Sequence, residues 1–440
     1  MKKHPTDVHL EALLDQDRDR QEILLHIIQC DRCRERVEGI LRRLRARTSA
    51  DPQKDEPEQT ANPGALPFAL VLLQERIDAP ELLDELLGQP QARRQTLLSN
   101  PRLHTWGLSE LLVERSLETV TRDPWRAEEL GALALDLSGF LETGFYGAAT
   151  IQDLRARAWA YIGNARRVRS DLAGAQTAFD SARVYLRRGT RSPFELAVLL
   201  DLEASLRRDQ RLLDEAGDLF RQASRIFLKE GEPHRAGRSL VNLSTVHYFT
   251  GDLEEALALL RQSLDFLDMK REPRLRLYAC HNLSSYLTEA GRFHEAREVY
   301  RQTRQLYREH PEPWVQNRRT WVRGRILGGL GHPARAEALL LAARDGFLAE
   351  GVPYDTALVS LEIAMLYAEQ GRTAELKRLA GEMVPIFSSL HIHREALAAL
   401  AFLIRAIESE TADLEKVKAV SDYLRRAANR PELRFEEPER

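Results

Sequence analysis

Apolar residues recur at three- and four-residue spacing from about residue 65 onward, for example in segments 82–87, 108–112 and 130–137. This spacing puts the apolar side chains on one face of a helix, whereas a half-buried strand would show strict alternation. Gly and Pro separate many of the apolar stretches, and these residues favour turns between helices. The pattern predicts an all-α protein made of many helices joined by short turns.

The chain also repeats itself about every 40 residues, in four phrases that begin with a glycine. Self-similarity at such a spacing is typical of a stacked array, in which each unit buries its apolar face against its neighbours. We therefore predict an α-solenoid of helical hairpins. The four phrases run from Gly251 to Ala256, Gly291 to Ala296, Gly331 to Ala336 and Gly371 to Leu376.

Small residues recur in register within the repeats. In the clearest unit, bulky Trp159 precedes Gly163 on the first helix, and Ala175 and Ala182 lie on the second. Small residues let two packed helices approach closely. The frame fits six units over roughly residues 155–385. These units resemble the tetratricopeptide repeat, with a longer period than that family's usual length of about 34 residues. The resemblance implies paired helices that bind proteins or peptides.

Length and charge narrow the class of protein. A chain of 440 residues exceeds what one compact core usually holds, which favours an elongated solenoid. The 64 basic residues nearly balance the 67 acidic ones, so no overall charge attracts nucleic acid or a membrane. The apolar run 65–73 contains Pro67 and is shorter than the about 20 residues that span a bilayer. Three cysteines and the lack of a long apolar N-terminal segment predict a cytoplasmic protein.

Composition changes along the chain predict five parts. Residues 48–64 are polar, acidic and rich in Pro, with too little apolar surface to fold. The final helices are expected to be atypical because they cap an exposed core. The predicted parts are a small N-terminal module (1–47), a flexible linker (48–64), irregular N-terminal helical hairpins (65–150), tetratricopeptide-like repeats (151–388) and C-terminal capping helices (389–440).

The N-terminal module carries a metal-binding pattern, His26, Cys30 and Cys33, with H-x3-C-x2-C spacing. Residues four apart share a helix face, and a turn after Cys30 can bring the second thiolate to the same ion. A structural zinc takes four ligands, and His4 and His9 are the only other histidines of the module. We predict a Zn2+ site. The alternative is a reduced cysteine pair without metal near a helix end.

The module resembles the zinc-finger domain of anti-sigma factors. That family places an N-terminal histidine before a helix of the form L-x3-L-D, and the H-x3-C-x2-C core on a second helix. The resemblance implies that His4 is the fourth ligand and that the module captures a sigma factor. The matching residues in this chain are His4, Leu10, Leu14, Asp15, His26, Cys30 and Cys33.

The candidate groove lies on the first helices of the repeats, which line the concave face in tetratricopeptide repeats. Asn242 and Asn282 occupy equivalent positions, and an amide can both donate to and accept from an extended peptide backbone. An arginine cluster at 318, 319, 323 and 325 could bind a carboxylate through forked hydrogen bonds. The candidate partner-binding residues are Asn164, Arg167, Arg208, Asn242, Tyr248, His281, Asn282, Arg318, Trp321 and Arg325.

Each groove residue also has a purely structural interpretation. The amides can cap a turn or bridge two helices, and the arginines can form a solvated helix face paired with nearby acids. Trp321 can be an anchor for a partner, of the kind that dominates interface energies, or an ordinary packing residue.

Catalytic motifs are missing from the sequence. It contains no Walker A loop, no G-x-S-x-G elbow and no H-E-x-x-H pair. We predict a non-catalytic, regulatory protein–protein interaction adaptor, whose N-terminal module captures one partner and whose groove binds a second protein or peptide. One alternative is a structural scaffold in which zinc serves only N-terminal folding or self-association. Another is nucleic-acid binding through the arginine-rich segment 41–47.

Overall fold

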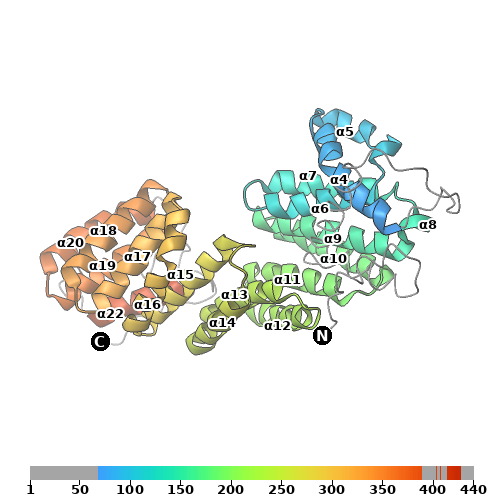
Figure 1. The fold of residues 1–440 in the computed structure, drawn as a ribbon. Coiled ribbons are helices and arrows are strands. Elements are labelled where there is room, and N and C mark those ends of the chain that lie inside the picture. Colours follow the sequence, from blue (N-terminus) through green and yellow to red (C-terminus); the bar gives the residue numbers. More distant parts are fainter. Residues whose placement is uncertain (1–67, 389–402, 404–406, 408–413, 428–440) are drawn as a thin grey trace, which may run out of the picture. The chain divides into compact units, whose positions relative to one another are not determined.

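The computed structural model describes residues 68–388, 403, 407 and 414–427 (Figure 1). Every regular element in these ranges is a helix, so the predicted all-α fold is confirmed there. None of the described helices is long and apolar enough to cross a bilayer. The N-terminal module with His4, His26, Cys30 and Cys33, the linker and most of the C-terminal cap fall outside the described residues, and the predicted boundaries stay predictions.

The chain divides into two compact units, and the division falls between Ala236 and Gly237. The first unit opens with helices of unequal length, where the sequence predicts irregular hairpins. The apolar segments 82–87, 108–112 and 130–137 all fall inside these helices. They are α4 (Phe68–Leu87), α5 (Gln91–Leu97), η2 (Pro101–Leu103), α6 (Trp106–Thr119), α7 (Pro124–Ser138) and α8 (Thr143–Tyr146).

Six helical hairpins follow, as the repeat pattern predicts, and α22 (Leu414–Ala427) packs on the last of them. The pairs are α9 (Ala148–Val168) with α10 (Leu172–Arg188), α11 (Pro193–Asp209) with α12 (Leu213–Lys229), α13 (Pro233–Thr250) with α14 (Leu253–Phe266), α15 (Pro273–Glu289) with α16 (Phe293–Glu309), α17 (Pro313–Gly329) with α18 (Pro333–Ala349), and α19 (Pro353–Glu369) with α20 (Thr373–Ser388).

The repeated glycine ends the first helix of a hairpin. At the end of α13 the N–H of Gly251 donates to the carbonyl of Tyr248 (3.2 Å), and the N–H of Asp252 donates to that of His247 (2.9 Å). These two bonds form a Schellman motif, which needs a left-handed residue at its fifth position. Gly251 has φ 89°. Because glycine has no Cβ, it adopts this conformation at little cost.

The earlier hairpins use other residues at the same turn, which explains why the glycine period begins only at residue 251. Ser170 (φ 68°) joins α9 to α10, and Arg211 (φ 67°) joins α11 to α12. Their N–H groups make the same kind of bond, 2.9 Å for Ser170 and 3.0 Å for Arg211. The turn geometry is thus shared although the residue differs.

The small residues lie where two helices approach closely. A Cβ added at Gly163 on α9 would lie 3.0 Å from the Phe179 ring on α10. Ala175 and Ala182 on α10 are fully buried. The predicted packing role of these small residues is therefore confirmed for this hairpin.

Candidate functional site

The second unit contains a pocket of about 390 Å³, lined by the first helices of four successive hairpins, α13, α15, α17 and α19. It contains several candidate residues from the sequence, namely Tyr248, His281, Asn282, Arg318, Trp321 and Arg325. It also contains side chains that the candidate set omits, among them Phe249, Tyr278, Tyr286, Tyr354, Asp355 and Leu358.

A repeat signal marks part of the omitted wall. Tyr278, Arg318 and Leu358 are each 40 residues apart and lie on α15, α17 and α19. They occupy one register position, about one helical turn before the candidate residues His281 and Trp321. Extending the predicted register by that turn would have found Tyr278 and Leu358.

One end of the pocket is aromatic. The rings of Tyr248 on α13 and Tyr286 on α15 stack with centroids 4.2 Å apart and an angle of 5° between their planes. Phe249 follows Tyr248, and Tyr278 on α15 is exposed. Burial raises the pKa of Tyr286, which keeps its hydroxyl protonated. Tyrosine rings offer apolar faces together with a hydroxyl that can form hydrogen bonds.

Asn282 is a polar pocket residue whose side chain forms no hydrogen bond with the described residues. The residue is only 8% exposed, it lines the pocket, and its amide has no hydrogen-bond partner among the described residues. The amide atoms are not among the sealed polar atoms without a partner, so they face the open space of the pocket, where a ligand can bond them. Asn242, its repeat equivalent on α13, does not line the pocket. Of the two equivalent amides, this pocket therefore contains Asn282, and the predicted joint contact of both amides with a peptide stays a prediction.

Arg325 joins three inner helices. Its Nε lies 3.1 Å from Glu362 Oε1 on α19, and its Nη2 donates to Glu289 Oε2 on α15 at 3.0 Å. Its Nη1 donates to Ser285 Oγ at 3.2 Å. The indole Nε1 of Trp321 donates to the other oxygen of Glu362 at 2.7 Å. These bonds occupy the polar atoms of Arg325 and Trp321. Both side chains therefore fit the structural alternative, in which they connect helices of the protein instead of contacting a partner.

The remaining arginines of the cluster separate. Arg318 Nη2 donates to Asp355 Oδ2 on α19 at 3.1 Å, with the arginine side chain 40% exposed. Arg319 instead donates to the Tyr300 hydroxyl at 3.1 Å, and Arg323 is exposed. Neither Arg319 nor Arg323 lines the pocket. The prediction of one four-arginine site is therefore narrowed to Arg318 and Arg325.

His281 is neutral at physiological pH. Burial, together with the positive charges of Arg318 and Arg325, lowers its pKa to about 3. Its Nδ1 lies 2.8 Å from the Tyr307 hydroxyl, which fixes the ring between α15 and α16. A neutral imidazole offers one donor and one acceptor, so this residue contributes polarity to the pocket without charge.

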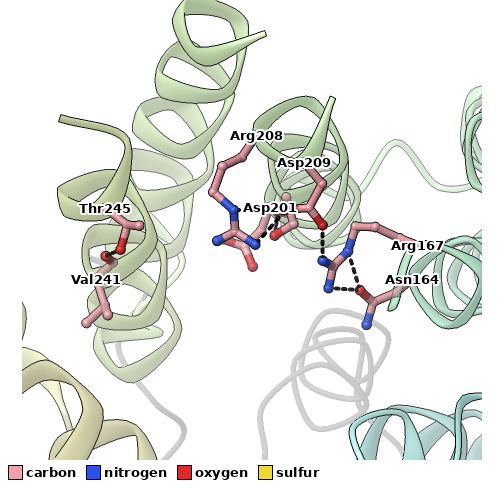
Figure 2. A network of polar contacts seen from close by, with 8 residues as sticks. Asn164, Arg167, Asp201, Arg208, Asp209, Val241 and Thr245 are labelled. Carbon is pink, nitrogen blue, oxygen red and sulfur yellow. Dashed lines mark hydrogen bonds and ion pairs between the residues drawn. The ribbon is translucent and has the colours of Figure 1, made fainter. Parts of the chain in front are cut away.

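The inner wall of the first unit holds three further candidates, Asn164, Arg167 and Arg208. Asn164 Oδ1 accepts from Arg167 Nε (3.1 Å) and Nη2 (2.9 Å), and Arg167 Nη1 bonds Asp209 Oδ2 at 2.5 Å (Figure 2). Arg208 donates to the other oxygen of Asp209 at 3.1 Å. The structure thus brings these candidates together with Asp209 rather than leaving them open.

No cluster of histidine, cysteine, aspartate and glutamate able to hold a metal occurs in the part of the chain that the structure describes. The predicted zinc ligands His4, His26, Cys30 and Cys33 lie outside that part, so the Zn2+ site stays a prediction. Cys280 is the one cysteine in the described part of the chain. Its side chain is buried and forms no disulfide bond there.

Comparison with known families finds tetratricopeptide repeats at residues 195–268 and again at residues 276–310. The resemblance seen in the sequence is confirmed over these segments. A search of curated protein sequences finds no match.

Two solved structures share the fold. One is a Rap protein complexed with competence and sporulation factor, with 13% identity, TM-score 0.51, and coverage of 74% of this chain and 88% of that one. The other is the apo form of RapI, with 12% identity, TM-score 0.53, and coverage of 72% and 86%. At this identity the likeness concerns the stacked helical hairpins alone.

Proposed function

We propose that this protein is a non-catalytic regulatory adaptor whose second-unit pocket binds an extended segment of a peptide or protein. The observation that carries the proposal is Asn282, a residue only 8% exposed whose amide faces the pocket and has no partner among the described residues. A carboxamide can accept from a main-chain N–H and donate to a main-chain carbonyl at once. A peptide backbone supplies both groups wherever it runs.

The shape and surface of the pocket fit such a ligand. Its volume of about 390 Å³ lies within the range of small-ligand sites, roughly 300–1,000 Å³. The stacked Tyr248 and Tyr286 offer an apolar face for a side chain beside the amide. A protein of similar fold was solved in complex with competence and sporulation factor, which is consistent with ligand binding by this architecture.

The proposal is tested by retention of random-sequence short peptides on the immobilised full-length protein. We expect Asn282→Ala to reduce retention about tenfold, the effect of losing one or two buried hydrogen bonds. Asn242→Ala is the matched control, because it removes an amide at the equivalent repeat position outside the pocket. Equal retention by the two variants and the unaltered protein would exclude Asn282 as the peptide contact.

We propose further that His4, His26, Cys30 and Cys33 bind Zn2+ and that the N-terminal module captures a second partner, by resemblance a sigma factor. The support is the ligand spacing in the sequence. Zinc content and co-purifying proteins are measured for the full chain and for a variant with both cysteines changed to serine. We expect the variant to lose the metal and one partner. An unchanged partner set would favour the scaffold alternative, in which zinc serves only folding or self-association.

A further inference from the structure

The arginine cluster at 318–325 contains one guanidinium with open donors in the pocket. A guanidinium has five N–H donors, and Arg318 uses Nη2 for Asp355. Its Nε and Nη1 have no hydrogen-bond partner among the described residues. Arg325, by contrast, is bonded through Nε, Nη1 and Nη2. Arg318 is therefore the arginine that can accept an additional anion.

The ion pair with Asp355 leaves the guanidinium of Arg318 able to bind a second anion. The arginine side chain is 40% exposed and the pair is bridged by a single contact of 3.1 Å, so water screens it. Nη2 carries two N–H groups, one beside the Nε–H and one beside Nη1, so a second carboxylate can make a forked contact on the edge of the guanidinium that Asp355 does not use. Asp355 and a ligand anion can share the guanidinium, although they compete for its charge.

The surroundings of Arg318 favour an anion. His281 and Asn282 line the same pocket, and each has polar atoms without a partner among the described residues. Asp355 is the one acidic side chain among the described lining residues. Glu362, which is not a lining residue, is only 6% exposed in its side chain and is held by Arg325 and Trp321.

The effect of charge on His281 supports this picture. After burial, the influences that depress its pKa are the positive charges of Arg318 and Arg325. The two guanidinium charges thus act on the ring of His281, which lines the pocket.

We propose that Arg318 forms an anion subsite with His281 and Asn282, and that the segment bound in the pocket presents a carboxylate to it. The inference rests on the proposed peptide-binding function and specifies the chemistry of the ligand. The carboxylate can come from an acidic side chain or from the C-terminus of a peptide. Arg325 is the positioning residue of this site, since it joins the helices that carry the subsite.

The experiment uses four pools of short random-sequence peptides on the full-length protein: with or without aspartate and glutamate, and with a free or an amidated C-terminus. We expect at least one carboxylate-containing pool to be retained about tenfold more than the pool that lacks both, as for a charged hydrogen bond. The pool that is retained identifies the source of the carboxylate. Arg318→Gln should abolish the difference between pools.

Two further variants decide whether the ion pair is only structural. Asp355→Asn removes the competing anion and should raise retention of the carboxylate pool, a gain that misfolding cannot produce. Arg319→Gln, the adjacent arginine outside the pocket, should leave retention unchanged. Equal losses in Arg318→Gln and Asp355→Asn would overturn the inference, because they would assign the pair to structure alone.

The pools also separate this inference from the proposed function. If all four pools are retained equally by the unaltered protein and lost together in Asn282→Ala, peptide binding stands and the anion subsite is wrong. If no pool is retained better than by Asn282→Ala, the proposed function fails, and the anion subsite fails with it.

Discussion

The inner walls of the two units carry similar polar side chains in opposite states. In the first unit Arg167 donates to both Asn164 and Asp209. In the second, Asn282 is equally well buried, at 8% against 5% exposure for Asn164, yet has no partner among the described residues. A buried amide on the inner face of a repeat can therefore either stabilise the stack of helices or be left available for a ligand. Its neighbours decide between these roles.

The largest effect should come from the network that supports the pocket. Arg325→Ala leaves the buried carboxylate of Glu362 without its charged partner. Removing one member of a buried ion pair costs about 3–5 kcal/mol, so we expect the free energy of unfolding to fall by that amount. Urea denaturation measures it. Arg323→Ala, an exposed arginine on the same helix, is the control. Equal unfolding midpoints would mean that the network does not hold α15, α17 and α19 together.

The comparison itself is tested by one substitution made at two sites. Asn164→Ala removes both hydrogen bonds to Arg167 and should lower the free energy of unfolding by about 1.5 kcal/mol. Peptide retention should not change. Asn282→Ala breaks no bond within the described protein and should leave the free energy of unfolding within about 0.5 kcal/mol of the unaltered value. Retention should fall.

The two variants are measured side by side, by denaturation and by peptide retention. A loss of stability in Asn282→Ala as large as that in Asn164→Ala would show that both amides are structural. A loss of retention in Asn164→Ala would show that the closed network of the first unit also takes part in binding.

The units should also differ in the sign of one pH effect. Burial raises the pKa of Asp153 on α9 from 3.8 to about 6, against the opposing hydrogen bonds from Thr190. Between these values the folded state binds more protons than the unfolded state, so its contribution to stability falls as pH rises. His281 behaves oppositely. Its pKa is lowered from 6.5 to about 3, so between these values its contribution rises with pH.

This pH prediction is checked by measuring the free energy of unfolding between pH 4 and 6 for Asp153→Asn and His281→Gln. Relative to the unaltered protein, Asp153→Asn should gain stability as pH rises, and His281→Gln should lose it. Parallel slopes for the two variants would contradict the assigned burial of one of these groups.

The smallest effect concerns the turns. Arg211 adopts a left-handed conformation in the first unit, at the position that glycine occupies in the second. A side chain is strained there, so Arg211→Gly should raise the free energy of unfolding by up to about 1 kcal/mol. Gly291→Ala, at φ 70°, should lower it by a similar amount. Thermal unfolding checks both changes, and a loss of stability in Arg211→Gly would show that its side chain makes a contact that outweighs the strain.

The sequence was sufficient to predict the helices, the hairpins and the close approach at Gly163, because these depend on local spacing and on residue size. Tyr248, Asn282 and Trp321, which the sequence predicts on the inner helices, line the pocket of the second unit. It could not predict which polar groups are satisfied. The partner of Arg318 is Asp355, 37 residues away, and that of Trp321 is Glu362, 41 residues away. Such pairings depend on how adjacent hairpins pack and on rotamers, which the helical period does not specify.

The bonds of Arg325 and Trp321 reach only from one hairpin to the next, whereas the pocket wall draws residues from four. In a stack of this kind each layer senses only the layers beside it. A ligand segment that contacts all four hairpins would link helices that have no direct contact with one another. It would therefore reduce the bending and twisting that contacts between neighbouring hairpins alone allow. Binding of a ligand in the pocket would then be detectable in the second unit, away from the pocket, as a reduced flexibility of the stacked hairpins.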